Sequence, residues 1–214
     1  MTKYVLSLDG GGVRGLATAN FLRKLEFEMH KPILDKFDLV CGSSTGGILA
    51  IALSVLKLNG SRLVNIYSSR NLKKIFSTVM PRIIGPKYGS RRKNNILKEY
   101  FGTLALDEAE VPAIVVAYDL KKRSTKLFKT FEDRDLMAWK VASATSAAPT
   151  FFPAVRIKDD WYLDGAISSN NPALIAYSEA KKLWPDENIK ILSIGTGYDD
   201  KPLSGLKAKN WGII

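Results

Sequence analysis

The chain has 214 residues, of which 46% are hydrophobic and 25% charged, and this is enough to close one sizeable core. The composition excludes a disordered tail and a collagen-like repeat. The 32 Lys and Arg residues outnumber the 21 Asp and Glu residues and give a net charge of +11, which favours anionic partners such as lipid surfaces or nucleic acid. A single cysteine, Cys41, excludes an intrachain disulfide and a Cys-rich zinc site, so we expect a reducing compartment.

We expect no secretory signal at the N-terminus. The mainly apolar run before the aspartate and the glycines has only five residues, 4–8, and a secretory signal needs a longer apolar core. The longest apolar stretch, 47–56, is far shorter than the roughly 20 residues of a membrane-spanning helix. We therefore predict a cytoplasmic protein whose contact with membranes is peripheral.

The first part of the chain alternates between two kinds of pattern. Residues 4–8 and 37–41 are short apolar runs that stop abruptly, as buried strands stop at tight loops. Residues 15–29 repeat apolar side chains at helical spacing, and residues 45–58 form a strongly apolar helical segment. The predicted order is strand, helix, strand, helix.

The second part of the chain continues this alternation. Further strands are predicted at 113–118, 125–130, 161–163 and 189–194, and further helices at 134–144 and 172–184. Strands that alternate with helices predict an α/β fold with three layers, α/β/α, around a mostly parallel central sheet. Because the sequence shows neither a repeat nor a clean linker, we expect residues 1–214 to form a single domain.

A basic stretch at 71–98 interrupts the alternation. It contains eight Lys and Arg residues and is broken by prolines and glycines, which predicts a flap with short helices. Two interpretations stay open, a solvated charged flap and a surface that docks on anionic membranes. We expect no nucleic-acid partner, because no helix-turn-helix, zinc-finger or RNA-binding motif accompanies the charge.

A candidate nucleophile lies in the segment Gly42-Ser43-Ser44-Thr45-Gly46, which matches GxSxG between a predicted strand and a predicted helix. A serine in such a turn has a strained backbone, and the small residues Gly42 and Gly46 leave room for it. The turn would present the Ser44 hydroxyl near the free N–H groups at the start of the helix, which stabilise negative charge. A chance match in a loop rich in glycine and serine is the alternative. Neighbouring Cys41 is expected to be a small core residue.

A glycine-rich loop follows the first predicted strand. Gly10, Gly12 and Gly15 satisfy GxGxxG, so a dinucleotide-binding domain must be considered. A dinucleotide-binding domain needs an acidic residue at the end of the second strand to bind the ribose, and this chain has Cys41 and Gly42 there. The competing use is a loop of bare N–H groups that faces an oxyanion, and a merely structural turn is a third possibility.

A serine nucleophile needs a base. The single histidine, His30, closes the first amphipathic helix, where we expect it on the opposite side of the sheet from Ser44, so a Ser-His-Asp triad is not predicted. A carboxylate could act directly instead. Asp9 and Asp164 both follow a short apolar run and precede a glycine, and the pattern alone does not separate them.

Four ordered motifs together resemble the patatin-like phospholipase family. They are Asp9-Gly10-Gly11-Gly12-Val13-Arg14-Gly15, the elbow at Ser44 followed by Gly47, the segment Ala144 to Pro153, and Asp164-Gly165-Ala166 followed by Asn170-Asn171-Pro172. Their spread from residue 9 to residue 172 argues against coincidence.

The resemblance implies a Ser-Asp dyad without a histidine, with Ser44 as nucleophile and Asp164 as general base. It implies that Gly10, Gly11 and Gly12, with the backbone around Arg14, form the oxyanion hole. It also gives motif positions that hold these groups, namely Gly15, Gly42, Gly46, Gly165 and Ala166. No metal and no cofactor are implied. The expected activity is phospholipase A-type hydrolysis of acyl esters of glycerophospholipids through an acyl-enzyme, although members of the family also act on other acyl lipids.

One departure from the family concerns the C-terminus. Relatives commonly carry further helices after the strand that matches 189–194, whereas this sequence stops at Ile214. The expectation is either a short variant or a truncated form. Two alternative functions stay open, an NAD-type dinucleotide-binding domain and a non-catalytic lipid-binding module. The sequence does not predict the oligomeric state.

Overall fold

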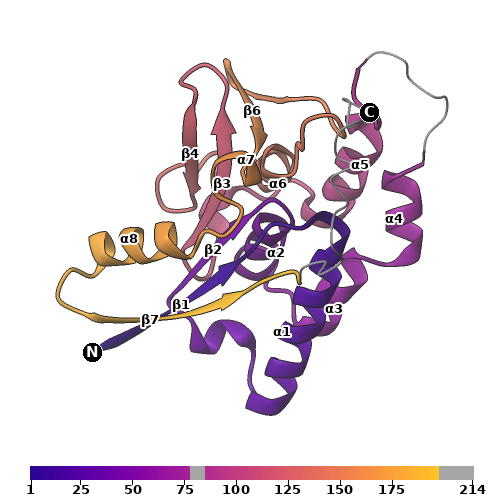
Figure 1. The fold of residues 1–214 in the computed structure, drawn as a ribbon. Helices are drawn as coiled ribbons and strands as arrows, with labels where there is room; N and C mark the ends of the chain where they lie inside the picture. The colour runs from indigo at the N-terminus through magenta and orange to yellow at the C-terminus, as the bar shows by residue number, and fades with distance from the viewer. Residues whose placement is uncertain (78–84, 198–214) are drawn as a thin grey trace, which may run out of the picture.

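A seven-stranded sheet forms the centre of the protein (Figure 1). The computed structural model describes residues 1–77 and 85–197. The strands are β1 (Thr2–Leu8), β2 (Leu39–Ser43), β3 (Ala113–Asp119), β4 (Ser124–Lys129), β5 (Val155–Ile157), β6 (Asp160–Asp164) and β7 (Asn188–Ile194). The sheet order is β5-β6-β3-β2-β1-β7, and β4 also pairs with β3.

The sheet is mixed rather than mostly parallel. β7, β1, β2 and β3 run parallel, as the alternation of strands and helices predicted. β4, β6 and β5 are added by antiparallel pairing, and β3–β4 and β5–β6 follow each other after loops too short for a parallel crossover. The predicted α/β fold class is confirmed, with a parallel centre and an antiparallel extension.

The pairing of β3 brings two distant parts of the chain together. Residues Val115 and Val116 pair with β2 and with β4, so these two strands lie on opposite edges of β3. Residues 117–119 pair with β4 and with β6. β2 and β6 therefore share the same edge of β3, end to end, and β6 begins to pair where β2 leaves the sheet.

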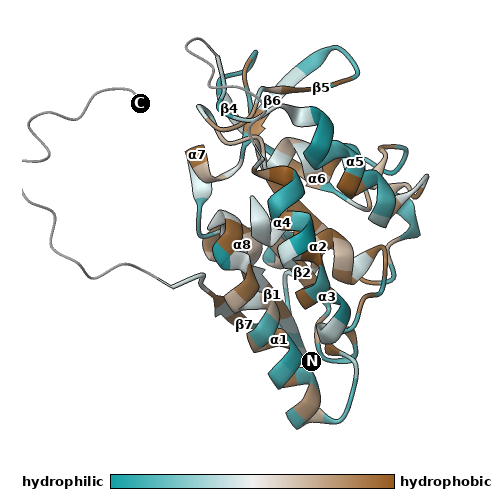
Figure 2. Cartoon of the chain, turned by 90° about the vertical axis from the view of Figure 1, so that its right-hand side faces the viewer, coloured by the Kyte–Doolittle hydropathy of each residue, from teal (hydrophilic) through white to brown (hydrophobic). Residues whose placement is uncertain are grey.

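Helices cover both faces of the sheet. They are α1 (Gly15–Met29), α2 (Thr45–Ser54), α3 (Gly60–Ile66), α4 (Ser69–Ile75), α5 (Ser90–Phe101), α6 (Ala138–Thr145), α7 (Ala166–Ser169) and α8 (Ala173–Leu183). On one face, Ala176 and Ala180 of α8 pack on Cys41 and the neighbouring strands, so the expectation of a buried core cysteine is confirmed. α1, α2 and α6 contribute to the larger core on the other face. The buried helix α2 is largely hydrophobic, whereas α1 alternates hydrophilic and hydrophobic segments (Figure 2).

Two helix ends differ from the prediction by four residues each. The helix expected at 45–58 ends at Ser54, because Leu58 N–H bonds back to the Ala52 carbonyl and closes a turn. The helix expected at 134–144 begins at Ala138. The residues before it pair with the segment 104–106: the Ala138 N–H donates to the Leu104 carbonyl, and the Leu136 carbonyl accepts the Leu106 N–H. A local turn replaces the helical hydrogen bonds in the first case, and pairing with a distant segment of the chain replaces them in the second.

The basic stretch at 71–98 contains the end of α4 and the first part of α5, and residues 78–84 lie outside the described residues. Most of its described cations are exposed, but Lys93 is only 4% exposed. Across the described part of the chain, no helix is both long and apolar enough to cross a membrane.

Candidate active site

The chain turns sharply at Ser44, between β2 and α2. Ser44 has φ 53° and ψ −121°, a strained conformation for a residue with a side chain. A Cβ built on Gly42 would overlap the Gly46 carbonyl, and one built on Gly46 would overlap the Leu8 carbonyl. Only glycines fit at these two positions, so the predicted strained elbow is present.

The Ser44 hydroxyl donates a 2.7 Å hydrogen bond to Oδ2 of Asp164. Both residues are buried, with 7% and 3% of their surfaces exposed. Asp164 is the last residue of β6, and Ala117, its partner on β3, follows the Val116 that pairs with Ser43. The shared edge of β3 thus places two side chains 120 residues apart in direct contact.

Asp164 lies in a setting that tunes its basicity. Burial raises the pKa of its carboxyl above the ordinary value, because a charged group loses solvation there. Hydrogen bonds from the Ala166 N–H and the Ser44 hydroxyl, and the positive charge of Lys93, act in the opposite direction on this pKa. The result is a carboxylate that is held in place and is more basic than an exposed aspartate.

Thr145, at the end of α6, connects the two residues. Its Oγ1 accepts the Ser44 N–H at 2.9 Å and donates to the Val116 carbonyl at 2.5 Å. Its carbonyl accepts the N–H of Gly165, the residue after Asp164. The backbones of the nucleophile and of the acid are therefore fixed by one residue.

Fewer N–H groups of the glycine loop are free to bind an oxyanion than the sequence predicted. The N–H of Gly10 donates to the Asn170 carbonyl at 2.9 Å, so this N–H is not available to an oxyanion. The Arg14 N–H bonds to the Gly11 carbonyl within a short 3-10 turn, and the Arg14 side chain is exposed. Among the described residues no hydrogen bond uses the N–H groups of Gly11, Gly12 and Val13, which leaves these three as the free donors of the loop.

The other candidate groups lie elsewhere. Asp9 is not bonded to Ser44; its Oδ2 accepts a hydrogen bond of 3.2 Å from the Asn171 side chain. Burial raises the pKa of Asp9, and the Asn171 hydrogen bond opposes this. His30 is exposed and ends α1, as the sequence predicted. Structure therefore separates the two aspartates that the pattern left equivalent.

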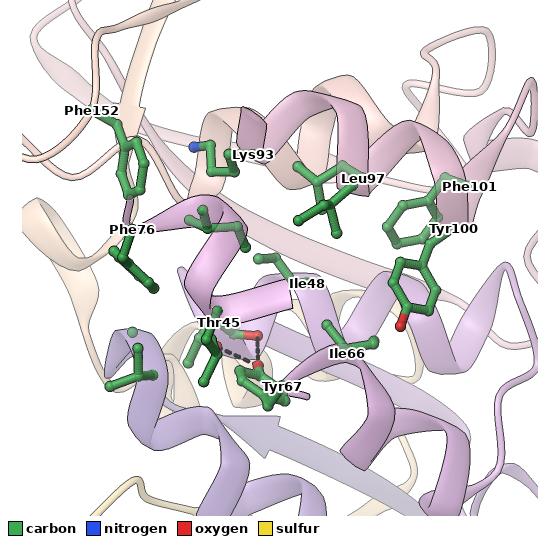
Figure 3. Close-up of a pocket in the computed structure, with 15 residues that line it drawn as sticks. Thr45, Ile48, Ile66, Tyr67, Phe76, Lys93, Leu97, Tyr100, Phe101 and Phe152 are labelled. Atoms are coloured by element: carbon green, nitrogen blue, oxygen red, sulfur yellow. Dashed lines mark hydrogen bonds between the residues drawn. The ribbon is translucent and has the colours of Figure 1, made fainter. Parts of the chain in front are cut away.

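An apolar pocket adjoins the elbow (Figure 3). Gly12 of the glycine loop and Thr45 of the elbow line one part of it. The hydroxyl groups of Thr45 and Tyr67 are hydrogen-bonded to each other in this wall. The other walls are mainly aliphatic and aromatic and include Ile48, Phe76, Leu97, Phe101 and Phe152. Such a pocket suits an apolar group such as a hydrocarbon chain.

Lys93 is the charged side chain in this pocket wall, and Figure 3 shows it pointing toward Phe152. Its Nζ lies 4.5 Å from the centre of the Phe152 ring. Burial lowers the pKa of Lys93 to about 7, and the nearby Asp164 acts in the opposite direction. Within the described residues, no cluster of three or more His, Cys, Asp or Glu side chains could hold a metal ion.

Sequence reasoning assigned no role to Thr145, Asn170 or Lys93. Thr145 and Asn170 stood inside motifs that were recognised, but their hydrogen bonds depend on the tertiary contact. The sequence contains a signal for the burial of Lys93. This lysine lies three and four residues before Ile96 and Leu97, and this helical spacing places it on the same buried face of α5. A lysine in register with apolar residues indicates a buried cation.

Comparison with known proteins identifies the family. The sequence profile described as "Patatin-like phospholipase" matches residues 6–177. The chain belongs to the patatin-like phospholipase family, which confirms the predicted resemblance. Membership argues against the dinucleotide-binding alternative.

Individual relatives agree with this assignment. The chain is 32% identical to "Patatin-like protein 2" of Oryza sativa subsp. indica, over 98% of this chain and 65% of that protein. It is 32% identical to "cGAMP-activated phospholipase" of Pseudomonas aeruginosa, over 91% of this chain and 62% of that protein. It is 31% identical to human "Calcium-independent phospholipase A2-gamma", over 90% of this chain and 28% of that protein. The chain thus spans less than two thirds of each of these relatives.

Among solved structures, VipD from Legionella pneumophila has a similar fold. The TM-score is 0.61 at 14% identity, and the match covers 77% of this chain and 46% of that chain. The predicted fold class agrees with this likeness.

Proposed function

We propose that this protein hydrolyses acyl esters of glycerophospholipids through an acyl-enzyme formed on Ser44. The observation that carries the proposal is the 2.7 Å hydrogen bond from the Ser44 hydroxyl to Asp164, buried beside an apolar pocket. Family membership and relatives named as phospholipases support the same class of activity.

In the first step, Ser44 Oγ attacks the carbonyl carbon of the ester and its proton passes to Oδ2 of Asp164. The strained elbow and the Thr145 contact hold Oγ in place, so little freedom is lost on reaching the transition state. The N–H groups of Gly11 and Gly12 are the donors we assign to the developing oxyanion. The leaving alcohol takes the proton from Asp164 as the tetrahedral intermediate collapses to the acyl-enzyme.

In the second step, water attacks the acyl-enzyme with Asp164 again as base, and the fatty acid leaves when the Ser44 hydroxyl is restored. The pocket beside Thr45 would hold the acyl chain, because its walls offer hydrocarbon and aromatic contacts.

The enzyme would meet its substrate as a cytoplasmic protein docked peripherally on anionic membranes. The exposed cations Lys73, Lys74, Lys87, Arg91 and Arg92 lie on or near α4 and α5, whose other faces line the pocket. Each cation close to an anionic surface contributes about 1 kcal/mol to binding. Sedimentation with vesicles that contain or lack phosphatidylserine tests this docking, which should depend on the anionic lipid and weaken in high salt.

The test of the proposed chemistry uses a fluorophosphonate probe that labels activated serines. We expect covalent labelling of the wild type, loss of labelling in Ser44→Ala, and a loss of hydrolysis of at least about 10³-fold in the same variant. Phospholipid hydrolysis followed by mass spectrometry gives the position of the cleaved ester. Esterase activity that survives Ser44→Ala would refute the proposal, and a wild type that binds lipid without labelling would identify a non-catalytic lipid-binding module.

A further inference from the structure

The buried ammonium of Lys93 joins two helices next to the candidate active site. Its Nζ donates to the Ser143 carbonyl at 3.0 Å, the Ser146 carbonyl at 2.9 Å and the Ser146 hydroxyl at 3.1 Å. These three bonds use all three donors of the ammonium group. Since its donors are used, Lys93 is not placed to bind a polar ligand itself; it is placed to hold the end of α6.

This end of α6 needs such a partner. The last carbonyls of a helix lack intrahelical hydrogen bonds and carry partial negative charge, so a buried cation there satisfies and stabilises them. A second contact between the helices, from the Ser143 hydroxyl to Asn94 Oδ1 at 2.6 Å, lies beside the first. α5 and α6 are thus joined where α6 ends.

The residues at this end contact both members of the candidate dyad. Thr145 accepts the Ser44 N–H through its hydroxyl and the Gly165 N–H through its carbonyl. The Ala147 carbonyl accepts the N–H of Asp164. A shift of the segment 143–147 would therefore move Ser44 and Asp164 relative to each other.

We propose that Lys93 is a positioning residue for the hydrolytic reaction: by holding the C-terminal turn of α6, it fixes the distance between Ser44 and Asp164. This inference rests on the proposed function. Lys93 also acts through its charge, because its ammonium stabilises the ionised form of Asp164 and so favours the state that accepts the proton.

The groups that face this charge are few. Among the described residues, Lys93 and Asp164 are the charged groups that shift each other's pKa. The remaining neighbours of the ammonium, Ser143, Ser146 and Phe152, are uncharged. A change in the charge of Lys93 should therefore register mainly at Asp164.

The experiment compares Lys93→Met with Lys98→Met, using a water-soluble ester so that membrane docking does not contribute. Lys98 is a matched control because it lies on the same helix, is exposed and rests 4.4 Å from the Trp139 ring of α6. We expect Lys93→Met to lower kcat by roughly 10- to 100-fold with KM nearly unchanged, since a small misplacement of reacting groups has this effect. Lys98→Met should keep the wild-type kcat.

Two further readouts separate positioning from a general loss of stability. The acid limb of the kcat/KM profile should move to higher pH in Lys93→Met, because Asp164 loses a stabilising positive charge, and Lys93→Arg should restore its position. Thr145→Val should lower kcat by a similar factor, and the double variant with Lys93→Met should lose less than the product of the two factors. Wild-type kcat and pH profile in Lys93→Met would overturn the inference, as would full additivity with Thr145→Val.

Amide hydrogen exchange tests the positioning role of Lys93 without any measurement of catalysis. Peptides that cover 143–147 and Ser44 should exchange faster in Lys93→Met than in Lys98→Met, even in an enzyme that hydrolyses nothing. Unchanged exchange would overturn the positioning role, whereas a wild type without labelling at Ser44 would overturn the proposed function alone. If Lys93→Met does not fold, Lys93→Gln, which keeps an N–H donor without the charge, is measured in the same way.

Discussion

The N–H of Ala166 donates a 2.8 Å hydrogen bond to Oδ1 of Asp164, which leaves Oδ2 of the same carboxylate to accept the Ser44 hydroxyl. One backbone group therefore sets the rotation of the carboxylate. Since α7 begins at Ala166, directly after Gly165, the chain that follows the acid also orients it.

Replacing Asp164 by asparagine should keep the fold and remove turnover. The amide oxygen can still accept the Ala166 N–H, but the amide nitrogen that then faces Ser44 is a donor and takes no proton. We expect kcat/KM to fall by about 10²- to 10⁴-fold, the usual contribution of a general base. Steady-state kinetics measures this loss, and a wild-type circular dichroism spectrum and melting temperature serve as the control. Near-normal turnover by this variant would show that another group acts as base.

The acid limb of the pH profile should reflect the environment of Asp164. Burial raises the pKa of Asp164, and only the ionised carboxylate can accept the Ser44 proton. Activity should therefore be present above this raised pKa and be lost as the pH falls through it, at a higher pH than for an exposed aspartate. The kcat/KM profile of the wild type between pH 3 and pH 7 tests this, and a limb at or below the range of an exposed aspartate would contradict it.

An alkaline limb should appear as Lys93 loses its proton. Burial lowers the pKa of Lys93 to about 7, so the ammonium is present below this pH and is converted to a neutral amine above it. The amine has two N–H groups for three acceptors and no charge to stabilise Asp164. We expect kcat/KM to decline above about pH 7 in the wild type and to stay level in Lys93→Arg, whose side chain remains charged. The same decline in both proteins would assign the limb to another group.

His30→Ala should retain most of the wild-type activity. α1 leaves the glycine loop at Gly15 and ends at Met29, and its 15 residues correspond to a length of about 22 Å. His30 is exposed at the far end of this helix and has no hydrogen bond to either member of the dyad. Kinetics with the soluble ester should agree with the wild type within about twofold. A folded His30→Ala variant without activity would instead favour a histidine base.

Gly46→Ala should destabilise the protein strongly. An added Cβ would overlap the Leu8 carbonyl at the end of β1, and a backbone atom in a packed sheet cannot move aside easily. We expect a loss of about 3 kcal/mol or more in the free energy of unfolding. Gly89→Ala is the control, because Gly89 has an ordinary extended backbone (φ −78°, ψ 148°) and open space around it, so an added methyl should cost only about 1 kcal/mol. Urea denaturation of both variants measures the difference, and equal losses would contradict the role assigned to Gly46.

The sequence predicted most of the sheet and its helices because these elements depend on local patterns. The apolar runs at 4–8 and 189–194 became β1 and β7 with small changes at the ends. The prediction missed the start of α6 because residues near Leu136 pair with a segment around Leu104, and periodicity along the chain contains no such information.

The sequence by itself determined the family and the residues that could react, because each motif is formed by neighbouring residues. The elbow is recognised by the glycines around its serine, and a candidate reactive side chain by its position at the end of a predicted strand. Tertiary structure decided which aspartate meets Ser44, since β6 and not the strand before Asp9 continues the edge of β3 that β2 leaves. It also decided that the Gly10 N–H is used by Asn170 and that Lys93 is buried against α6. These outcomes depend on hydrogen bonds between segments far apart in the chain, and such bonds exist only after the sheet and helices have packed.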